Sequence, residues 1–149
     1  MRAVIQRVSS ASVTANSEPK GEIDAGILVL LGIHKDDGEP ELQWMVNKII
    51  NLRIFEDKKG KMNRSLIDTG GAMLVVSQFT LYGDCRKGRR PGYSNAAPPE
   101  KAKKYYQQFI DAVKQKQIVT ASGRFQAHMD VELVNDGPVT LLLDSSKLF

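Results

Sequence analysis

The stretch Gly26-Ile27-Leu28-Val29-Leu30-Leu31-Gly32-Ile33 is a continuous apolar run bounded by glycines. Such a run is typical of a strand that is buried on both faces, because a strand with one face in water would alternate apolar and polar residues. It therefore predicts a central strand, with other elements packed on both sides of it.

Further strands are predicted before and after this run. Residues 3–8 are rich in β-branched residues, and residues 16–21 supply turn chemistry. Residues 127–133 alternate apolar with polar side chains, as a half-buried strand does. The remaining predicted strands, separated by turns at 57–61 and 135–138, are residues 53–55, residues 72–77 continuing into 78–82, and residues 139–143.

Two helices are predicted from apolar residues at helical spacing. The first begins within residues 36–40, where acidic residues and a proline suit a first turn, and its stripe comprises Leu42, Met45, Val46, Ile49 and Ile50. The second begins at Pro98-Pro99-Glu100, and its stripe comprises Ala102, Tyr105, Tyr106, Phe109 and Val113. Each stripe should pack on the sheet.

These elements indicate an α/β fold, a curved and largely antiparallel β-sheet or barrel with two packed helices. One domain should span residues 1–149, because no segment has the composition of a linker and two ordinary domains would not fit this length. A domain of this size buries roughly 70% of the surface of its unfolded chain, so it can hold a core without metals or cross-links.

The expected location is the cytoplasm. The apolar runs 27–31 and 139–143 are far shorter than the ~20 residues that span a bilayer, so no membrane association is expected. Residues 1–7 place arginine where a signal peptide needs its apolar stretch. Cys85 is the only cysteine, which excludes an internal disulfide and a cysteine-rich metal site.

The net charge of +4 is unevenly distributed. Residues 84–104 contain seven basic and two acidic residues, whereas the rest of the chain contains 14 basic and 15 acidic residues. Such a local excess is either a phosphate-binding surface or a solvated loop and helix face.

The common catalytic signatures are absent: G-x-S-x-G, H-E-x-x-H, the phosphate loop and the dinucleotide fingerprint. His34 and His128 are the only histidines, and both are expected at the surface. A Ser/His/Asp triad could be built only around one of these two. Cys85 is interpreted as a bystander thiol.

Two short stretches have unusual polar or backbone chemistry. Ser77-Gln78-Phe79-Thr80 puts two hydroxyls and a carboxamide at the end of an apolar strand, where ligands commonly bind. The alternative is a strand that simply emerges into solvent. Asp136-Gly137-Pro138 permits a tight or positive-φ backbone, and on local grounds it is a plain turn.

Taken together, Ser77-Gln78-Phe79-Thr80-Leu81 and Asn135-Asp136-Gly137-Pro138-Val139-Thr140 resemble the two signature motifs of the D-aminoacyl-tRNA deacylases. Residues 1–8, Gly88-Arg89-Arg90-Pro91 and Gly123-Arg124-Phe125 are also similar to segments of that family. The resemblance thus covers nearly the whole chain. It departs at Gln126, where most relatives should have glycine, and leaves both motifs intact.

The resemblance implies the deacylase fold and an enzyme that hydrolyses the ester joining a D-amino acid to the terminal adenosine of tRNA. The resemblance also implies that the enzyme removes glycine misplaced on alanine tRNA. It further implies a homodimer that uses no metal or organic cofactor. The implied catalytic residues are Ser77, Gln78, Phe79 and Thr80, and the amides of Phe79 and Thr80 could bind an oxyanion. No histidine or lysine lies near Thr80 in the sequence, so Thr80 is interpreted first as a positioning residue and second as a nucleophile. The resemblance favours activation of the water with help from a ribose hydroxyl.

By the same resemblance, Gly137-Pro138 has a cis bond and enters the active site of the opposite subunit. There it would exclude an L side chain and admit a D side chain or glycine. Arg7 matches an arginine that supports this dipeptide. Ala102, Phe125 and Met129 match positions near the adenosine pocket, whereas without the resemblance Met129 would be a core residue and Ala102 a helix-packing residue.

A tRNA substrate gives the local positive charge a task, the holding of acceptor-stem phosphates. The candidates for this contact are Arg86, Lys87, Arg89 and Arg90.

Two other functions are weighed against the deacylase. A non-catalytic tRNA-binding module would bind tRNA without cleaving its ester, and a small-molecule esterase would act on free esters without RNA. Neither explains both motifs.

Overall fold

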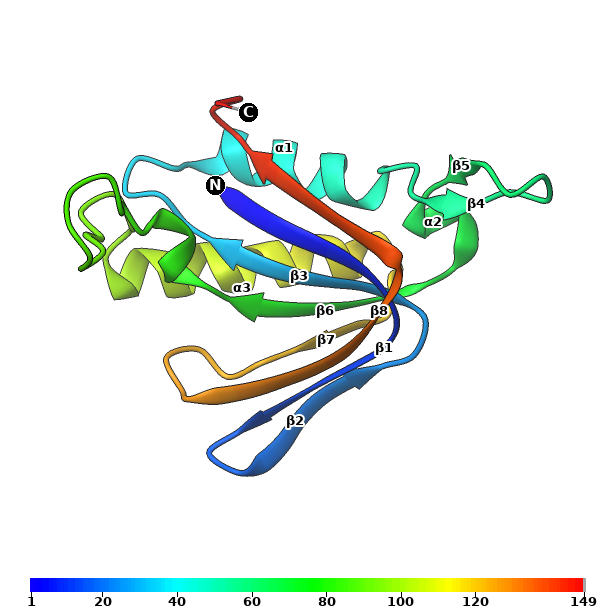
Figure 1. Ribbon diagram of the computed structural model, residues 1–149, viewed down its shortest axis with the longest axis horizontal. Coiled ribbons are helices and arrows are strands. Elements are labelled where there is room, and N and C mark those ends of the chain that lie inside the picture. The colour runs from blue at the N-terminus through cyan, green and yellow to red at the C-terminus, as the bar shows by residue number, and fades with distance from the viewer. Residues whose placement is uncertain (149) are drawn as a thin grey trace.

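The computed structural model describes residues 1–148, which fold into one α/β domain around a strongly curved sheet (Figure 1). The sheet strands are β1 (Arg2–Ala15), β2 (Glu18–Ile23), β3 (Gly26–Gly32), β6 (Ala72–Ser77), β7 (Thr120–Ser122) and β8 (Met129–Asp144). The helices are α1 (Glu39–Ile50), α2 (Leu66–Thr69), the 3₁₀ helix η1 (Phe79–Tyr82) and α3 (Pro99–Gln115). A small separate hairpin consists of β4 (Phe55–Glu56) and β5 (Met62–Arg64).

β1 is the long strand that organises the sheet. It pairs antiparallel with β2, β3 and β8, whereas β3 pairs parallel with β6, and β6 with β7. Parallel neighbours need a long crossover connection, and α1 and α3 lie in these two connections. The predicted curved, largely antiparallel α/β fold is therefore confirmed, and the two parallel pairs lie at one end of the sheet.

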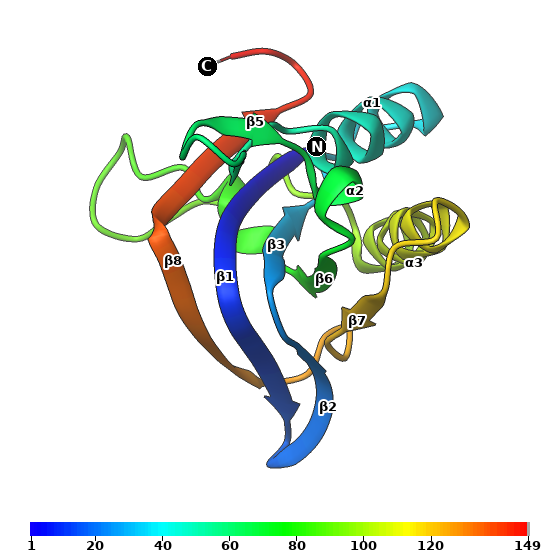
Figure 2. The same cartoon turned by 90° about the vertical axis from the view of Figure 1, so that its right-hand side faces the viewer.

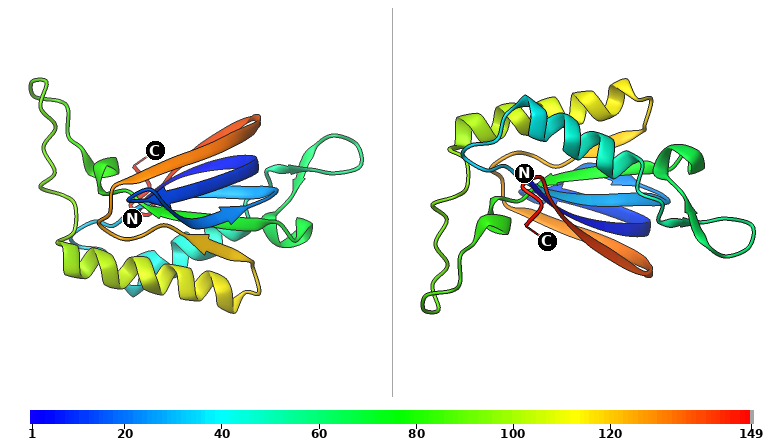
Figure 3. Two further views of the ribbon diagram at one scale, coloured as in Figure 1. Left: turned by 90° about the horizontal axis from the view of Figure 1, so that it is seen from below. Right: turned by 90° about the horizontal axis from the view of Figure 1, so that it is seen from above.

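Apolar side chains cover both faces of β3, as its sequence predicts. Ile27, Val29 and Leu31 belong to the core beneath α1 and α3, which lie on the same side of the sheet (Figures 2 and 3). Leu28 belongs to a second cluster, with Leu74 and residues from β1 and β2. The predicted stripe of α1 is buried throughout. The helices and both clusters thus hold the ends of β3 and β6 in place.

The segment after β6 differs from the prediction. Residues 78–82 are not an extension of the strand: β6 ends at Ser77, and η1 turns the chain away from the sheet. Gly32 allows this turn to lie close to β3, because a Cβ there would be only 3.0 Å from the carbonyl oxygen of Gln78. Such an approach between segments distant in sequence cannot be read from local propensity.

The segment 135–138 is also not a chain reversal between two strands. β8 runs through it as one strand, and both of its halves pair with β1. Gln6 pairs with Thr140 and Val8 with Asn135, so four residues of β8 oppose Arg7 alone. An insertion of this kind bends a strand without ending it. We call residues 136–139 the β8 bulge.

The helix prediction is right for the two long helices, α1 and α3, and misses two short ones. In α2, Ser65 caps the first turn by accepting a hydrogen bond from the amide of Asp68 at 3.2 Å. Within residues 1–148, no helix is long and apolar enough to cross a membrane.

Candidate active site

A cavity of about 630 Å³ lies where the end of β6, the start of α3 and the segment between β7 and β8 meet. Six of the predicted site residues line it: Ser77, Gln78, Phe79, Ala102, Phe125 and Met129. Thr80 joins them through its hydroxyl, which accepts a hydrogen bond from the side-chain amide of Gln78. The fold therefore brings together residues that are up to 52 positions apart in the sequence.

The first two amides of η1 are available to a ligand. Within residues 1–148, the amides of Phe79 and Thr80 donate no hydrogen bond, whereas those of Leu81 and Gly83 bond to the carbonyls of Gln78 and Thr80. The first amides of a helix have no acceptor inside it. Two adjacent unpaired donors beside a cavity are suited to hold an oxygen that gains negative charge.

The Thr80 hydroxyl has no catalytic base beside it. In the described part of the chain its only hydrogen-bond partner is the Gln78 amide, which donates to it. Within residues 1–148, neither a histidine nor a carboxylate is hydrogen-bonded to it. A serine- or threonine-type nucleophile needs such a base, so the geometry favours the backbone amides over the hydroxyl as the chemical groups.

Aromatic side chains form the other wall of the cavity. Phe125 lies 5.9 Å, centroid to centroid, from Tyr106 of α3, and the Tyr106 hydroxyl donates a 2.9 Å hydrogen bond to the carbonyl of Val75 in β6. Burial raises the pKa of Tyr106 to about 12, so this phenol stays protonated and acts as a link between α3 and β6. An apolar wall of this kind suits a flat base.

Gln126 also lines the cavity, with a backbone φ of 61°. This left-handed conformation is one that glycine adopts more easily than glutamine. The glycine expected here from the resemblance would therefore fit this backbone better than glutamine does.

Gly137 and Pro138 do not line this cavity. They lie in the β8 bulge, joined by a cis peptide bond, and Gly137 has φ 124°. Arg7, only 6% exposed, supports the bulge: its Nε lies 3.2 Å from the carbonyl oxygen of Asp136 and 3.0 Å from the Asp136 carboxylate. Its Nη1 donates a 2.6 Å hydrogen bond to the carbonyl of Ile54. Arg7 thus ties the bulge to the loop before β4.

The basic loop, residues 84–92, leaves the cavity edge after η1. Its base is closed by two backbone hydrogen bonds between Asp84 and Gly92. Arg86 pairs with Asp84 at 2.7 Å, which holds the pKa of that carboxyl well below its usual range. Lys87, Arg89 and Arg90 are exposed and form no ion pair within residues 1–148. Of the four predicted RNA contacts, these three thus have no protein partner.

Among the cavity-lining residues that the sequence reasoning did not assign to the site are two tyrosines. Tyr93 follows the basic loop without a local pattern that marks it. The spacing of α3 predicts Tyr106 only as a core residue. It is indeed buried, but it also lines the cavity. Helical periodicity could indicate its burial and not what lies beside it.

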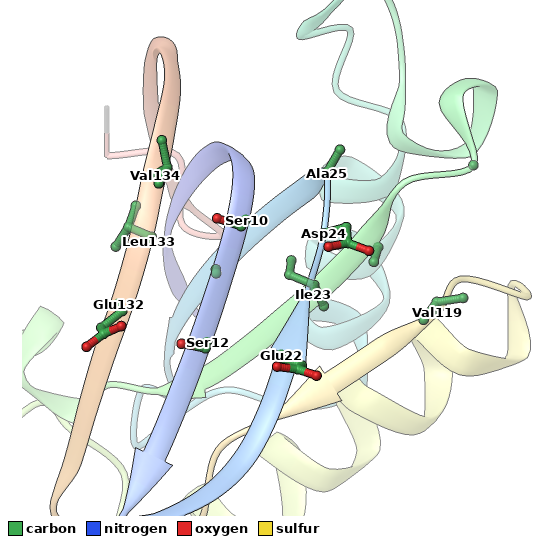
Figure 4. Close-up of a pocket in the computed structure, with 13 residues that line it drawn as sticks. Ser10, Ser12, Glu22, Ile23, Asp24, Ala25, Val119, Glu132, Leu133 and Val134 are labelled. Atoms are coloured by element: carbon green, nitrogen blue, oxygen red, sulfur yellow. The ribbon is translucent and has the colours of Figure 1, made fainter.

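A second hollow, of about 780 Å³, lies among β1, β2, β8 and the start of β7 (Figure 4). It carries Ser10 and Ser12 together with the carboxylates Glu22, Asp24 and Glu132. Acidic walls repel a polyanion such as RNA. Among the described residues, no group of three or more His, Cys, Asp or Glu is placed to hold a metal ion. The smaller cavity is therefore the candidate active site.

Comparisons with known proteins agree on one family. The family model described as D-Tyr-tRNA(Tyr) deacylase matches residues 4–144. Proteins named D-aminoacyl-tRNA deacylase from Clostridioides difficile (strain 630) and Desulfotalea psychrophila (strain LSv54 / DSM 12343) are 60% and 62% identical, over all of this chain and all of theirs.

Two solved structures are also similar. One, titled c-Myc DNA Unwinding Element Binding Protein, has a TM-score of 0.90 and 43% identity, and the match covers 97% of this chain and 98% of that one. Another, titled as a probable eukaryotic D-amino acid tRNA deacylase, has a TM-score of 0.83 at 16% identity, over 95% and 97% of the two chains. The second similarity supports the fold alone.

Proposed function

Since the chain belongs to the D-Tyr-tRNA(Tyr) deacylase family, we propose that it hydrolyses the ester between a D-amino acid and the terminal adenosine of tRNA. The products are the free D-amino acid and the free tRNA. The observation that carries the proposal is the pair of unpaired amides, at Phe79 and Thr80, beside a cavity with an aromatic wall.

The proposed chemistry is an attack by water on the ester carbonyl. The Phe79 and Thr80 amides bind the carbonyl oxygen as it gains negative charge, while Gln78 and Ser77 hold the edge of the site. The bond from the carbonyl carbon to the ribose oxygen then breaks, and the ribose oxygen takes up the proton. The neighbouring ribose hydroxyl assists the water, so the reaction as proposed uses no metal or organic cofactor.

The terminal adenosine is proposed to lie against Ala102, Phe125 and Met129. These three residues line the same cavity as Phe79 and present apolar surface to a flat base. A bound adenosine there would place its esterified ribose near η1.

Chiral selection is proposed to come from a second copy of the chain. In a homodimer, Gly137 and Pro138 of the partner subunit would enter the cavity and occupy the space of an L side chain. The position of the β8 bulge outside its own cavity, and its support by Arg7, are consistent with this role. Glycyl-tRNA(Ala) has no side chain to collide, so it is a proposed substrate as well.

The proposed location of the protein is the cytoplasm, because charged tRNA occurs there.

Release of D-tyrosine from D-tyrosyl-tRNA by the purified protein tests the proposal. Hydrolysis that depends on the tRNA portion supports it. Binding of tRNA with no cleavage would make the protein a non-catalytic module, and cleavage of small free esters at the same rate would make it an esterase. Either outcome would overturn the deacylase proposal.

Replacing the Thr80 hydroxyl should have a modest effect. The Thr80→Ala variant keeps the backbone amide, so kcat is expected to fall at most about tenfold, or ~1.4 kcal/mol in barrier. Single-turnover hydrolysis of D-tyrosyl-tRNA measures this. A loss of more than about a thousandfold with unchanged KM, restored by Thr80→Ser, would instead identify a threonine nucleophile.

Removing the unpaired charges of the basic loop should weaken tRNA binding. The triple variant Lys87→Ala, Arg89→Ala, Arg90→Ala is expected to raise KM about tenfold with little change in kcat, because phosphate contacts position the substrate without taking part in the chemistry. The slope of log KM against log salt should fall by about one for each phosphate that the variant no longer binds.

The β4–β5 hairpin provides a control with the same change in charge. It lies at the opposite end of the molecule from the basic loop (Figures 1 and 3). The control substitutions are at its three exposed lysines, Lys58, Lys59 and Lys61. Equal KM values for both triple variants would show that only net charge matters. That result would contradict a defined binding surface on the basic loop.

A further inference from the structure

Two aromatic side chains at the mouth of the candidate active site are exposed and touch each other. Phe79 is 57% exposed and Tyr93 is 40% exposed, and their rings meet edge to face with centroids 5.1 Å apart. Among residues 1–148 they are the only phenylalanine, tyrosine or tryptophan side chains with such exposure. Both line the cavity of the proposed deacylation site.

The basic loop connects these two aromatic residues. The paired backbone hydrogen bonds between Asp84 and Gly92 close the base of the loop, so Tyr93 returns beside Phe79 of η1. Lys87, Arg89 and Arg90 lie on the loop itself and are exposed. A pair of exposed rings next to unpaired cations is the combination that binds single-stranded nucleic acid, with stacking for the base and charge for the phosphate.

The pair lies outside the contacts that the proposed reaction uses. Only the backbone amide of Phe79 is needed for the oxyanion, and the adenosine is assigned to the wall at Ala102, Phe125 and Met129. The ring of Phe79 and all of Tyr93 therefore remain as surface next to the ester, on the side from which the basic loop rises.

We infer that Phe79 and Tyr93 form a stacking platform for the unpaired nucleotide that precedes the terminal adenosine. This inference rests on the proposed function and deepens it, because it makes the substrate a single-stranded 3′ end rather than an aminoacylated nucleoside. The cations of the basic loop bind the phosphates further from the 3′ end. The expected gain from one stacked base is about five- to 150-fold in kcat/KM.

The test compares three substrates: D-tyrosyl-adenosine, the D-tyrosyl ester of cytidylyl-adenosine, and the same dinucleotide with an abasic first residue. The unmodified protein should hydrolyse the dinucleotide at least about fivefold more efficiently than the other two, which should resemble each other. Tyr93→Ala should make the dinucleotide and its abasic form equivalent substrates, whatever its effect on D-tyrosyl-adenosine, whereas Tyr93→Phe should preserve the ratio between them.

The outcomes separate this inference from the proposed function. Equal efficiency on the dinucleotide and its abasic form would overturn the platform while leaving the deacylase proposal intact. No hydrolysis of any of the three, nor of D-tyrosyl-tRNA, would overturn both. If Tyr93→Ala instead lowers the mass of the protein in solution and lowers hydrolysis of all substrates equally, the ring pair belongs to a protein interface, and the platform is wrong.

Discussion

D-Tyrosyl-tRNA is expected to be hydrolysed at least about a hundredfold faster than L-tyrosyl-tRNA, a difference of roughly 2.7 kcal/mol in barrier. The physical reason is steric. Backbone of the partner's β8 bulge would stand where an L side chain must go, and a D side chain would point away from it. Release of free amino acid from the two matched substrates measures the ratio, and equal rates would contradict the assignment.

Enlarging Gly137 should reduce both activity and this discrimination. In Gly137→Ala the new Cβ would lie 2.8 Å from Cγ2 of Val139 and 3.1 Å from Nη2 of Arg7, at a backbone φ of 124°. L-residues rarely adopt such a φ, and strain of this kind costs roughly 1–3 kcal/mol. The β8 bulge must therefore shift, and kcat/KM for the D substrate is expected to fall at least about tenfold.

Gly60→Ala is the matched control. Gly60 also has a positive φ, 73°, but a Cβ there would meet nothing within 4 Å. It lies between β4 and β5, away from the site. The control should cost about 1 kcal/mol of stability and leave kcat/KM and the D-to-L ratio unchanged. A Gly137→Ala variant that behaves in the same way would argue against a role of the β8 bulge in selection.

Replacing Arg7 should have the largest effect on stability. Arg7→Met keeps much of the apolar stem and removes the guanidinium, which leaves the buried carbonyl of Ile54 without its 2.6 Å donor and frees the Asp136 carbonyl. A buried acceptor left without its donor costs about 1–3 kcal/mol, and the Asp136 carboxylate, which is 54% exposed, adds little to this. The free energy of unfolding should fall by about this amount in urea titration, and deacylation should fall with it at temperatures where the variant is folded.

Two further variants separate the position of Arg7 from its charge. Arg7→Lys keeps the charge, but its single ammonium cannot reach the Ile54 and Asp136 carbonyls with a planar fork, so activity should be restored only in part. Arg53 is the control: it bonds to Asn63 at 2.9 Å on the exposed β4–β5 hairpin, and Arg53→Met should change stability by less than about 0.5 kcal/mol. Equal destabilisation at Arg7 and Arg53 would contradict the support proposed for the β8 bulge.

Most of the fold could be predicted from local patterns. The apolar run of β3 is buried on both faces, and the stripes of α1 and α3 face the sheet, because burial imposes periods that the sequence records. The residues of the two motifs could be named as candidates only through their joint resemblance to a family. Taken singly, each motif is also compatible with a solvated strand end or a plain turn.

Two of the wrong predictions share one physical cause. The local pattern of residues 78–82 predicts a strand, but Phe79–Tyr82 form a 3₁₀ helix, which Gly32 allows to lie close to β3. Residues 135–138 have the composition of a turn and form a bulge in one strand, because β1 pairs with β8 on both sides of it. In each case a segment distant in sequence overrides the local preference.

Local sequence patterns were sufficient for the fold class, the two long helices and the doubly buried central strand, and the joint resemblance of the two motifs indicated the family. The three-dimensional arrangement was needed to show that the amides of Phe79 and Thr80 are unpaired, that Tyr93 returns beside Phe79, and that Arg7 joins the β8 bulge to the loop at Ile54. Patterns of burial repeat every two to four residues and are therefore written locally. Contacts between elements depend on how the whole sheet curves, and no short stretch of the sequence contains that information.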